Sequence, residues 1–183
     1  MNHDEEILIR RIASGHSDDY RRLIARYAQP LMVFVGRIVH RQEDAEDVVQ
    51  DALVSAFEHL ADYDAARASF ATWLNSIAYH EALHHLRRRP SAFVEVDDAM
   101  LVGIPDELPD TTTAEQLDEA IRKLSPEDQT LLQLYYFDQR PLPEIAFILK
   151  GADDHLEREA SRLSTRLQRI RQRLRIILSK NRE

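Results

Sequence analysis

The chain has 183 residues, 44% of them apolar, with four glycines and no cysteine. This composition favours packed helices over a loop-rich or disordered chain, and it excludes disulfides, thiol catalysis and cysteine-ligated metals. The net charge is −8, but the bases cluster in residues 87–89 and in residues 161–183, and the second stretch holds eight bases against one acid. We therefore expect separate surfaces for different partners.

Apolar residues recur at three- and four-residue spacing along the chain, which predicts helices and no strand. The helices expected in the first half cover, in chain order, residues 5–13, 18–38, 43–60 and 69–88. Ser17 or Asp18 is expected to cap the second helix, and Pro30 to kink or break it. The third helix is expected to turn five side chains inward: Val48, Leu53, Ala56, Phe57 and Leu60.

Residues 90–113 contain three prolines, a glycine and many acids, and they predict an acidic linker. Beyond it we expect helices over residues 114–123, from a cap at Ser125, over residues 143–149, and in a basic segment within residues 154–179. The last helix is expected to pack through Leu163, Leu167, Ile170 and Leu174. The acidic first residues and the absence of a long apolar run predict a cytoplasmic protein without membrane insertion.

Residues 79–89 read YHEALHHLRRR and contain H-E-x-x-H, the pattern with which zinc peptidases place two imidazoles and a general base on one helical turn. A catalytic zinc site needs a third protein ligand, and Arg87 and Pro90 stand where one zinc-peptidase class has glycine and its third histidine. Glu95 and Glu107, the other candidates, fall in the predicted linker. A zinc hydrolase stays as an alternative, and no cofactor or metal is expected.

The same helix carries a second pattern, because Trp73, His80, His84 and Arg87 fall on one stripe. An aromatic ring, imidazoles and a guanidinium in line suit contact with unstacked bases and phosphate. The alternative is a packed tryptophan on an ordinary amphipathic helix with a solvated basic end.

The order of segments resembles a known family. The run DAEDVVQDALVSAFEHL, then F-x-x-W-L-x-x-I-A and LRRR, resembles region 2 of bacterial sigma factors, specifically the extracytoplasmic-function (ECF) group. KLSPEDQTLLQLYYFDQRPLPEIAFIL resembles the start of region 4, and LSTRLQRIRQRLR resembles its recognition helix. The resemblance covers nearly the whole chain except the linker.

The resemblance implies an all-α fold of two small helical domains: a region 2 helical bundle over residues 1–89 and a region 4 helix-turn-helix over residues 114–183, joined by the linker 90–113. It also implies an alternative sigma factor that catalyses no reaction. Such a protein binds core RNA polymerase at the β′ clamp and β flap and directs promoter recognition, melting and transcription initiation. Its implied partners are core polymerase, promoter DNA and an anti-sigma factor.

The resemblance also assigns candidate site residues. The residues expected to form an exposed acidic surface for the β′ clamp are Glu43, Asp44, Glu46, Asp47, Gln50 and Asp51. The residues expected at the −10 element are Asp62, Asp64, Trp73, His80, His84, Arg87, Arg88 and Arg89. The residues expected at the −35 element are Arg162, Ser164, Thr165, Arg166 and Arg169. Some basic residues either contact DNA or form a solvated helix end that complements the helix dipole, namely Arg171, Arg173, Arg175 and Lys180.

The chain departs from the family pattern in two places. His80 stands at a position where the family commonly has asparagine, which leaves the base preference open. Thirteen residues, 150–162, precede Leu163, whereas the family has about six. Either the recognition helix begins earlier or an acidic insertion lengthens the turn, and four carboxylates there would repel phosphate: Asp153, Asp154, Glu157 and Glu159.

Two non-enzymatic alternatives remain beside the sigma factor. A helix-turn-helix regulator would bind its operator without polymerase, and a sigma-like decoy would bind polymerase or an anti-sigma factor yet open no promoter.

Overall fold

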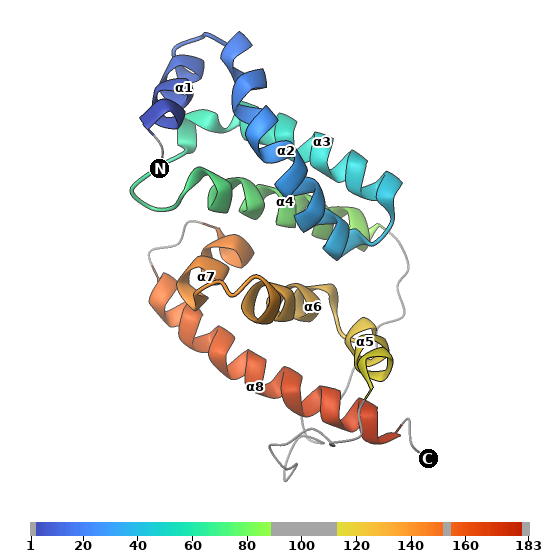
Figure 1. Cartoon of the computed structure of the whole chain (residues 1–183). Coiled ribbons are helices and arrows are strands. Elements are labelled where there is room, and N and C mark those ends of the chain that lie inside the picture. The colour runs from blue at the N-terminus through green and yellow to red at the C-terminus, as the bar shows by residue number, and fades with distance from the viewer. Residues whose placement is uncertain (1–2, 89–112, 152–154, 181–183) are drawn as a thin grey trace. The chain divides into compact units, whose positions relative to one another are not determined.

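The computed structural model describes residues 3–88, 113–151 and 155–180, and the fold of this part is all-α, without a strand (Figure 1). The chain divides into two compact units. Unit 1 comprises residues 1–90 with 146–156, and unit 2 comprises residues 91–145 with 157–183. The predicted linker and the basic residue Arg89 lie outside the described residues, apart from Thr113.

The described residues 3–88 of unit 1 form helices and a short 3-10 turn. In chain order they are α1 (His3–Ala13), α2 (Asp18–Val39), α3 (Gln42–Glu58), η1 (Leu60–Asp62) and α4 (Phe70–Arg87). The helices α2, α3 and α4 pack against one another, and α1 packs against α2 (Figure 1). Their core is apolar and fully buried at Leu23, Val35, Val48 and Leu74, because the three- and four-residue spacing puts such side chains on one face of each helix.

The expected cap at Ser17 is wrong, and of the kink or break expected at Pro30 the break is absent while the kink stays a prediction. Ser17 is its N-cap residue, but the serine has helical backbone angles and makes no capping hydrogen bond. Pro30 does not break the helix, which runs without interruption through that position. Pro30 is exposed, so water can satisfy the carbonyl that the missing proline N–H leaves unpaired.

In α3 the inward residues are mostly as expected. Val48 and Ala56 are buried, Leu60 is buried in η1, and Leu53 is half-buried. Phe57 is the exception, because 42% of it is exposed while its ring lies 4.9 Å from that of Tyr20. The tyrosine hydroxyl donates a hydrogen bond of 2.5 Å to the Leu53 carbonyl, and burial raises the pKa of Tyr20 to about 12. The α2–α3 contact therefore ends in a partly exposed aromatic pair.

Helix α4 begins as the sequence predicts. The Thr72 N–H donates to the Ser69 hydroxyl at 3.2 Å, which satisfies one of the orphan donors of the first turn. Phe70, Leu74 and Ala78 are buried on its core face.

Unit 2 contains short helices and one long one. In chain order they are α5 (Ala114–Arg122), α6 (Pro126–Leu132), the π-helical turn η3 (Gln133–Phe137) and α8 (Leu156–Lys180). In the chain, α7 (Leu142–Lys150) follows η3 and precedes α8. Its residues 142–145 belong to unit 2 and its residues 146–150 to unit 1, and residues 145–149 are buried. Ser125 caps α6 as predicted, accepting from the Asp128 N–H at 3.2 Å, and Pro126 occupies the first turn.

The long helix α8 is amphipathic in the predicted register. Leu163, Leu167, Ile170 and Leu174 are all buried, with exposures between 0% and 6%. Their spacing of four, three and four residues forms one continuous stripe, so the intervening basic residues fall on the remaining faces.

Candidate nucleic-acid interface

Helix α3 presents an acidic face to solvent. Glu43 has a side chain 86% exposed, and Asp47, Gln50 and Asp51 are also exposed. Glu46 is exposed beside them, bonded to Gln42 one turn earlier. The polar face therefore continues beyond the first turn, where the helix dipole alone would favour acids.

Asp44 departs from this description, and its expected exposure is wrong. Only 6% of the residue is exposed. Its carboxylate lies 3.4 Å from His85 Nε2 on α4 and 3.8 Å from Arg41 Nε. Asp44 is four residues before Val48 and so shares the inward face of α3. It joins α3 to the end of α4 instead of contributing to the acidic surface.

The segment between α3 and α4 is shaped by its own side chains. Asp62 and Asp64 are exposed, and the Ala66 N–H donates to Asp64 Oδ1 at 2.8 Å. The Tyr63 hydroxyl donates to the Ala68 carbonyl at 3.2 Å. These bonds give residues 62–68 a defined turn directly before α4.

Trp73 belongs to an aromatic cluster at the start of α4. Its ring centroid lies 5.4 Å from that of Tyr63 and 5.5 Å from that of Phe70, and Tyr27 lies 5.1 Å from Phe70. Trp73 is half-buried, so one part packs in the cluster while another part faces solvent. Burial raises the pKa of Tyr63. Sequence reasoning missed Tyr63, although a single aromatic residue inside the polar run ADYDAARAS was a usable signal.

Two of the three histidines of α4 lie on the surface. His80 and His84 are exposed, as are Arg87 and Arg88. Partial desolvation of the His80 ring, with the charge of Arg87, lowers the pKa of His80, so its neutral imidazole can both donate and accept a hydrogen bond at pH 7. Among the described residues, no group of three or more His, Asp or Glu side chains is placed to hold a metal ion.

Helix α8 begins at Leu156, seven residues before Leu163, so the recognition helix extends toward its N-terminus. Gly151, at φ 83°, adopts the left-handed conformation that ends many helices, and its N–H donates to the Phe147 carbonyl at 2.8 Å. Of the four carboxylates in question, Glu159 is paired with Arg162 and its side chain is only 13% exposed. Glu157 is exposed, and Asp153 and Asp154 lie outside the described residues.

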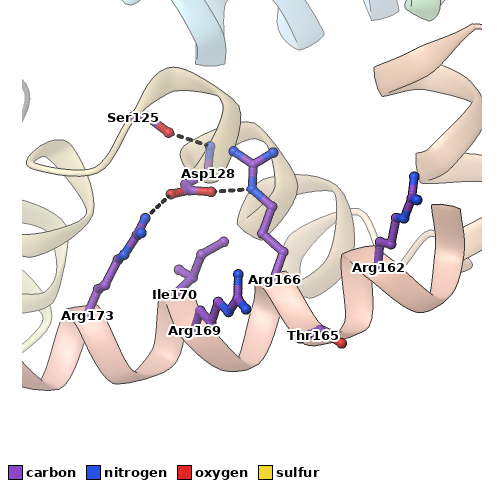
Figure 2. A pocket seen from close by; sticks show the side chains of 8 residues that line it. All are labelled: Ser125, Asp128, Arg162, Thr165, Arg166, Arg169, Ile170 and Arg173. Carbon is purple, nitrogen blue, oxygen red and sulfur yellow. Dashed lines mark hydrogen bonds and ion pairs between the residues drawn. The ribbon is translucent and has the colours of Figure 1, made fainter. Parts of the chain in front are cut away.

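The basic face of α8 borders a cleft of about 550 Å³ between α6 and α8 (Figure 2). Ser125 and Asp128 line it from α6, and four arginines line it from α8: Arg162, Arg166, Arg169 and Arg173. Thr165 also borders the cleft, and both Thr165 and Ser164 are exposed. A cleft with four guanidinium groups and one carboxylate is suited to an anionic ligand.

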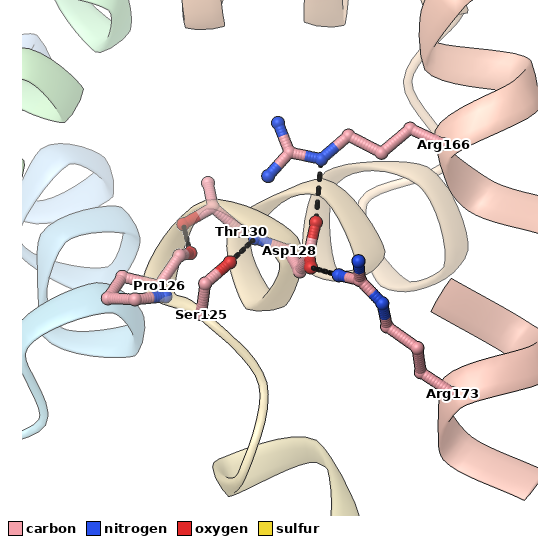
Figure 3. Close-up of polar contacts among 6 residues, drawn as sticks. All are labelled: Ser125, Pro126, Asp128, Thr130, Arg166 and Arg173. Atoms are coloured by element: carbon pink, nitrogen blue, oxygen red, sulfur yellow. Dashed lines mark hydrogen bonds and ion pairs between the residues drawn. The ribbon is translucent and has the colours of Figure 1, made fainter. Parts of the chain in front are cut away.

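Asp128 is the centre of the polar contacts in this cleft. It is 2% exposed, its Oδ1 accepts from Arg166 Nε at 2.6 Å, and its Oδ2 accepts from Arg173 Nη1 at 3.2 Å (Figure 3). Sequence reasoning recognised this acid only as a residue of the first turn of α6, because nothing local indicates that its partners lie 38 and 45 residues away.

The basic end of α8 differs from a simple solvated helix end. Arg171 is exposed, but Arg173 is paired with Asp128 and Arg175 is only 8% exposed. For these last two arginines the expectation of a solvated side chain is wrong. The side chain of Lys180 lies outside the described set.

Three consecutive aromatic residues at the end of η3 form a patch that sequence reasoning also missed. Tyr135, Tyr136 and Phe137 are 38%, 46% and 69% exposed. Their exposure follows from the π-helical turn, which shifts the register with which side chains meet the core. An exposed group of this kind marks an interaction surface more often than a single exposed ring does.

Comparison with known proteins places these surfaces in context. Residues 23–91 match the Sigma-70 region 2 family. The chain is 30% identical to the RNA polymerase sigma factor YlaC of Bacillus subtilis over 175 residues, which cover 92% of this chain and 96% of that protein. It is 23% identical to the ECF RNA polymerase sigma factor SigW of the same organism, with 77% and 82% covered.

A solved structure has a similar fold. The sigma factor RpoE of Bartonella quintana, in complex with the anti-sigma factor NepR, matches with a TM-score of 0.51 and 21% identity, covering 83% of this chain and 96% of that one. Among the described helices, none is long and apolar enough to cross a membrane.

Proposed function

The chain belongs to the extracytoplasmic-function RNA polymerase sigma factors, and we propose that it binds core RNA polymerase and directs it to a restricted set of promoters. The observation that carries this proposal is the arrangement of unit 1. An exposed acidic face on α3 and an exposed basic end on α4 occur in one small helical bundle, with an aromatic cluster at the start of α4. Opposite charges on two helices suit one basic protein partner and one nucleic acid.

The acidic face of α3 is the proposed contact with the polymerase β′ clamp. Its exposed members are Glu43, Glu46, Asp47, Gln50 and Asp51. Because these side chains are solvated and free of core packing, they can change partner at little cost to the fold. Asp44, being buried, is proposed to support this face from inside.

The −10 contact is proposed for the segment 62–68 and the exposed side of α4. Trp73 offers a ring held at one edge by Tyr63 and Phe70, and such a fixed ring can stack on an unpaired base. His80 and His84 follow on the same stripe, and Arg87 and Arg88 would contact phosphate. Arg89 belongs to the same proposal by sequence.

The −35 contact is proposed for α8, with Arg162, Ser164, Thr165, Arg166 and Arg169 as its residues. Exposed hydroxyl and guanidinium groups are the side chains that read base edges and hold phosphates in the major groove. The aromatic patch Tyr135–Phe137 of unit 2 is a candidate for the β flap, since it is apolar and exposed.

Further assignments depend on this function. We propose domain limits at residues 1–89 and 114–183 with a linker between them. The protein would act without catalysing a reaction of its own, in the cytoplasm where polymerase works. An anti-sigma factor is a proposed regulator, as NepR is bound to the Bartonella quintana sigma factor.

Run-off transcription with purified core polymerase and a promoter library tests the proposal. We expect transcripts that depend on both the chain and the promoter. Asp47→Arg with Asp51→Arg should abolish them by reversing the acidic face. Glu58→Arg, the reversal of a single acid at the exposed far end of α3, is the control and should leave them in place. No promoter-dependent transcript from any template would contradict the proposal, and tight operator binding without polymerase would favour a conventional regulator.

A further inference from the structure

We infer that Asp128 is a positioning residue for −35 recognition: its buried carboxylate holds Arg166 and Arg173 in the α6–α8 cleft so that the guanidinium of Arg166 meets DNA in one fixed orientation. The inference rests on the proposed function of α8 and extends it to a residue on a different helix.

Asp128 and Arg166 meet through the inner nitrogen of the guanidinium group. Asp128 accepts from the Nε of Arg166, and the dashed bond in Figures 2 and 3 meets this inner nitrogen and neither of the two terminal ones. Nε is the inner edge of the guanidinium group, so a bond there leaves the terminal edge available. That terminal edge is one that can engage a guanine or a phosphate through two parallel hydrogen bonds. The side chain of Arg166 is still 39% exposed.

Both oxygens of the Asp128 carboxylate are used in holding the two arginines. With 2% of its side chain exposed, Asp128 has little access to water, and its two oxygens divide between Arg166 and Arg173. A buried carboxylate with one partner missing is costly, so each arginine is held firmly. The Asp128 N–H is bonded to the Ser125 hydroxyl, and the Thr130 hydroxyl donates to the Pro126 carbonyl at 2.8 Å, which fixes the first turn of α6 itself (Figure 3).

A fixed guanidinium distinguishes DNA sequences better than a mobile one. A long flexible side chain loses rotamer freedom when it is ordered on DNA, and a side chain held in advance avoids much of that loss. A mobile arginine still attracts any phosphate, because that attraction depends on charge and only weakly on the orientation of the guanidinium group. Removing the carboxylate charge should therefore lower sequence preference while leaving general DNA affinity in place.

Asp128→Asn tests the inference with almost no change in volume. The amide has one acceptor oxygen, so one of the two arginines loses its partner and faces an N–H group. The control is Asp118→Asn, the same charge change in the same unit at an exposed aspartate that pairs with Arg122. Each variant is reconstituted with core polymerase, and its affinity is measured for a promoter duplex and for the same duplex with a scrambled −35 element.

We expect the wild type and Asp118→Asn to prefer the intact element equally, and Asp128→Asn to lose about tenfold of that preference, the range of one lost base contact. Its affinity for the scrambled duplex should stay the same or rise, with a salt dependence at least as steep. An equal loss on both duplexes, or an unchanged preference, overturns the inference.

Two further variants complete the test. If Asp128→Asn does not fold at the assay temperature, Asp128→Glu replaces it, since it keeps the charge and displaces the carboxylate by one methylene. An unchanged preference in that variant overturns the inference. Arg166→Lys keeps the charge without the fork, and it should lower the preference to the same extent as Asp128→Asn. A wild-type holoenzyme with no preference for the intact element would instead contradict the proposed role of α8 itself.

Discussion

Units 1 and 2 each contain a buried aspartate that joins two helices, and the two sites differ in the chemistry of their partners. Asp44 of unit 1 lies 3.4 Å from a histidine of α4 and 3.8 Å from Arg41, which precedes its own helix. Asp128 of unit 2 meets two arginines of α8 at 2.6 and 3.2 Å. Guanidinium groups stay charged at all accessible pH, whereas an imidazole carries charge only when protonated.

A buried aspartate that joins two helices therefore has a different consequence in each unit. In unit 2 the partners are themselves candidate DNA contacts, so the carboxylate controls the shape of an outer surface from inside the fold. In unit 1 neither Arg41 nor His85 is a candidate contact, and Asp44 only fixes where the acidic face of α3 stands relative to the end of α4. We expect the loss of the Asp128 carboxylate to lower the stability of unit 2 more than the loss of the Asp44 carboxylate lowers that of unit 1.

The largest expected effect is that of Asp128→Ala on stability. The change leaves two guanidiniums without their buried counter-ion, and we expect a loss of about 3–5 kcal/mol in the unfolding free energy of unit 2. Trp73 is the single tryptophan and lies in unit 1, so its fluorescence reports unit 1 while circular dichroism reports both units. The urea midpoint by circular dichroism should fall and the fluorescence midpoint should stay constant. Asp118→Ala, the exposed control, should change neither by more than about 0.5 kcal/mol. A shift in the fluorescence midpoint would contradict the expectation that the two units unfold separately.

Asp44→Ala should produce the opposite pattern with a smaller effect. Its distances to His85 and Arg41 are longer than those of Asp128 to its two arginines, and Arg41 is largely exposed, so we expect about 1–3 kcal/mol. The fluorescence midpoint should fall in this variant. Glu43→Ala, one residue earlier and 86% exposed, should leave stability unchanged and weaken binding to core polymerase. If Glu43→Ala destabilised the chain as much as Asp44→Ala, the distinction between the buried and the exposed acid would be wrong.

These two aspartates also show where sequence reasoning stops. Helix positions, the apolar stripe of α8 and the caps at Ser69 and Ser125 follow from local pattern, and the structure confirms them. The burial of Asp44 does not follow, because it depends on His85, which is distant in sequence and close only after α3 and α4 pack. Polar residues at the border of an apolar face take their environment from a partner helix, and no local pattern identifies that partner.

The missing capping bond at Ser17 and the missing break at Pro30 have a related cause. A serine before a helix and a proline within one carry strong propensities, yet packing and solvent exposure decide whether these act. The grouping of candidate contacts into a clamp face, a −10 set and a −35 set rests on family resemblance and stays a prediction. The Asp128 contact, the Tyr63 anchor and the aromatic patch of η3 were not predictable, since each needs the folded chain.

The helix caps allow a finer comparison of the two units. Ser69 and Ser125 each accept a backbone N–H at 3.2 Å, one in unit 1 and the other in unit 2. Replacing either with alanine should cost about 1 kcal/mol. Ser69→Ala should shift the fluorescence midpoint, and Ser125→Ala only the circular dichroism signal. Ser17→Ala is the matched control, because this serine makes no capping bond and should be neutral. A loss at Ser17 equal to that at Ser69 would mean that the hydroxyl contributes through another contact.

The smallest expected effect concerns pH and unit 1 alone. Desolvation and Arg87 lower the pKa of His80, so near pH 6 the unfolded chain binds more protons at this site than the folded chain does. Stability from this group is therefore complete above the unfolded pKa, about 6.5, and declines as the pH falls below it. The decline should be small, since His80 is exposed. His80→Gln should flatten the pH dependence of the fluorescence midpoint between pH 7.5 and 5.5, whereas His84→Gln on the same exposed stripe should leave the slope as it is in the wild type. An identical slope in the wild type and His80→Gln would show that the imidazole is as well solvated in the folded chain as in the unfolded one.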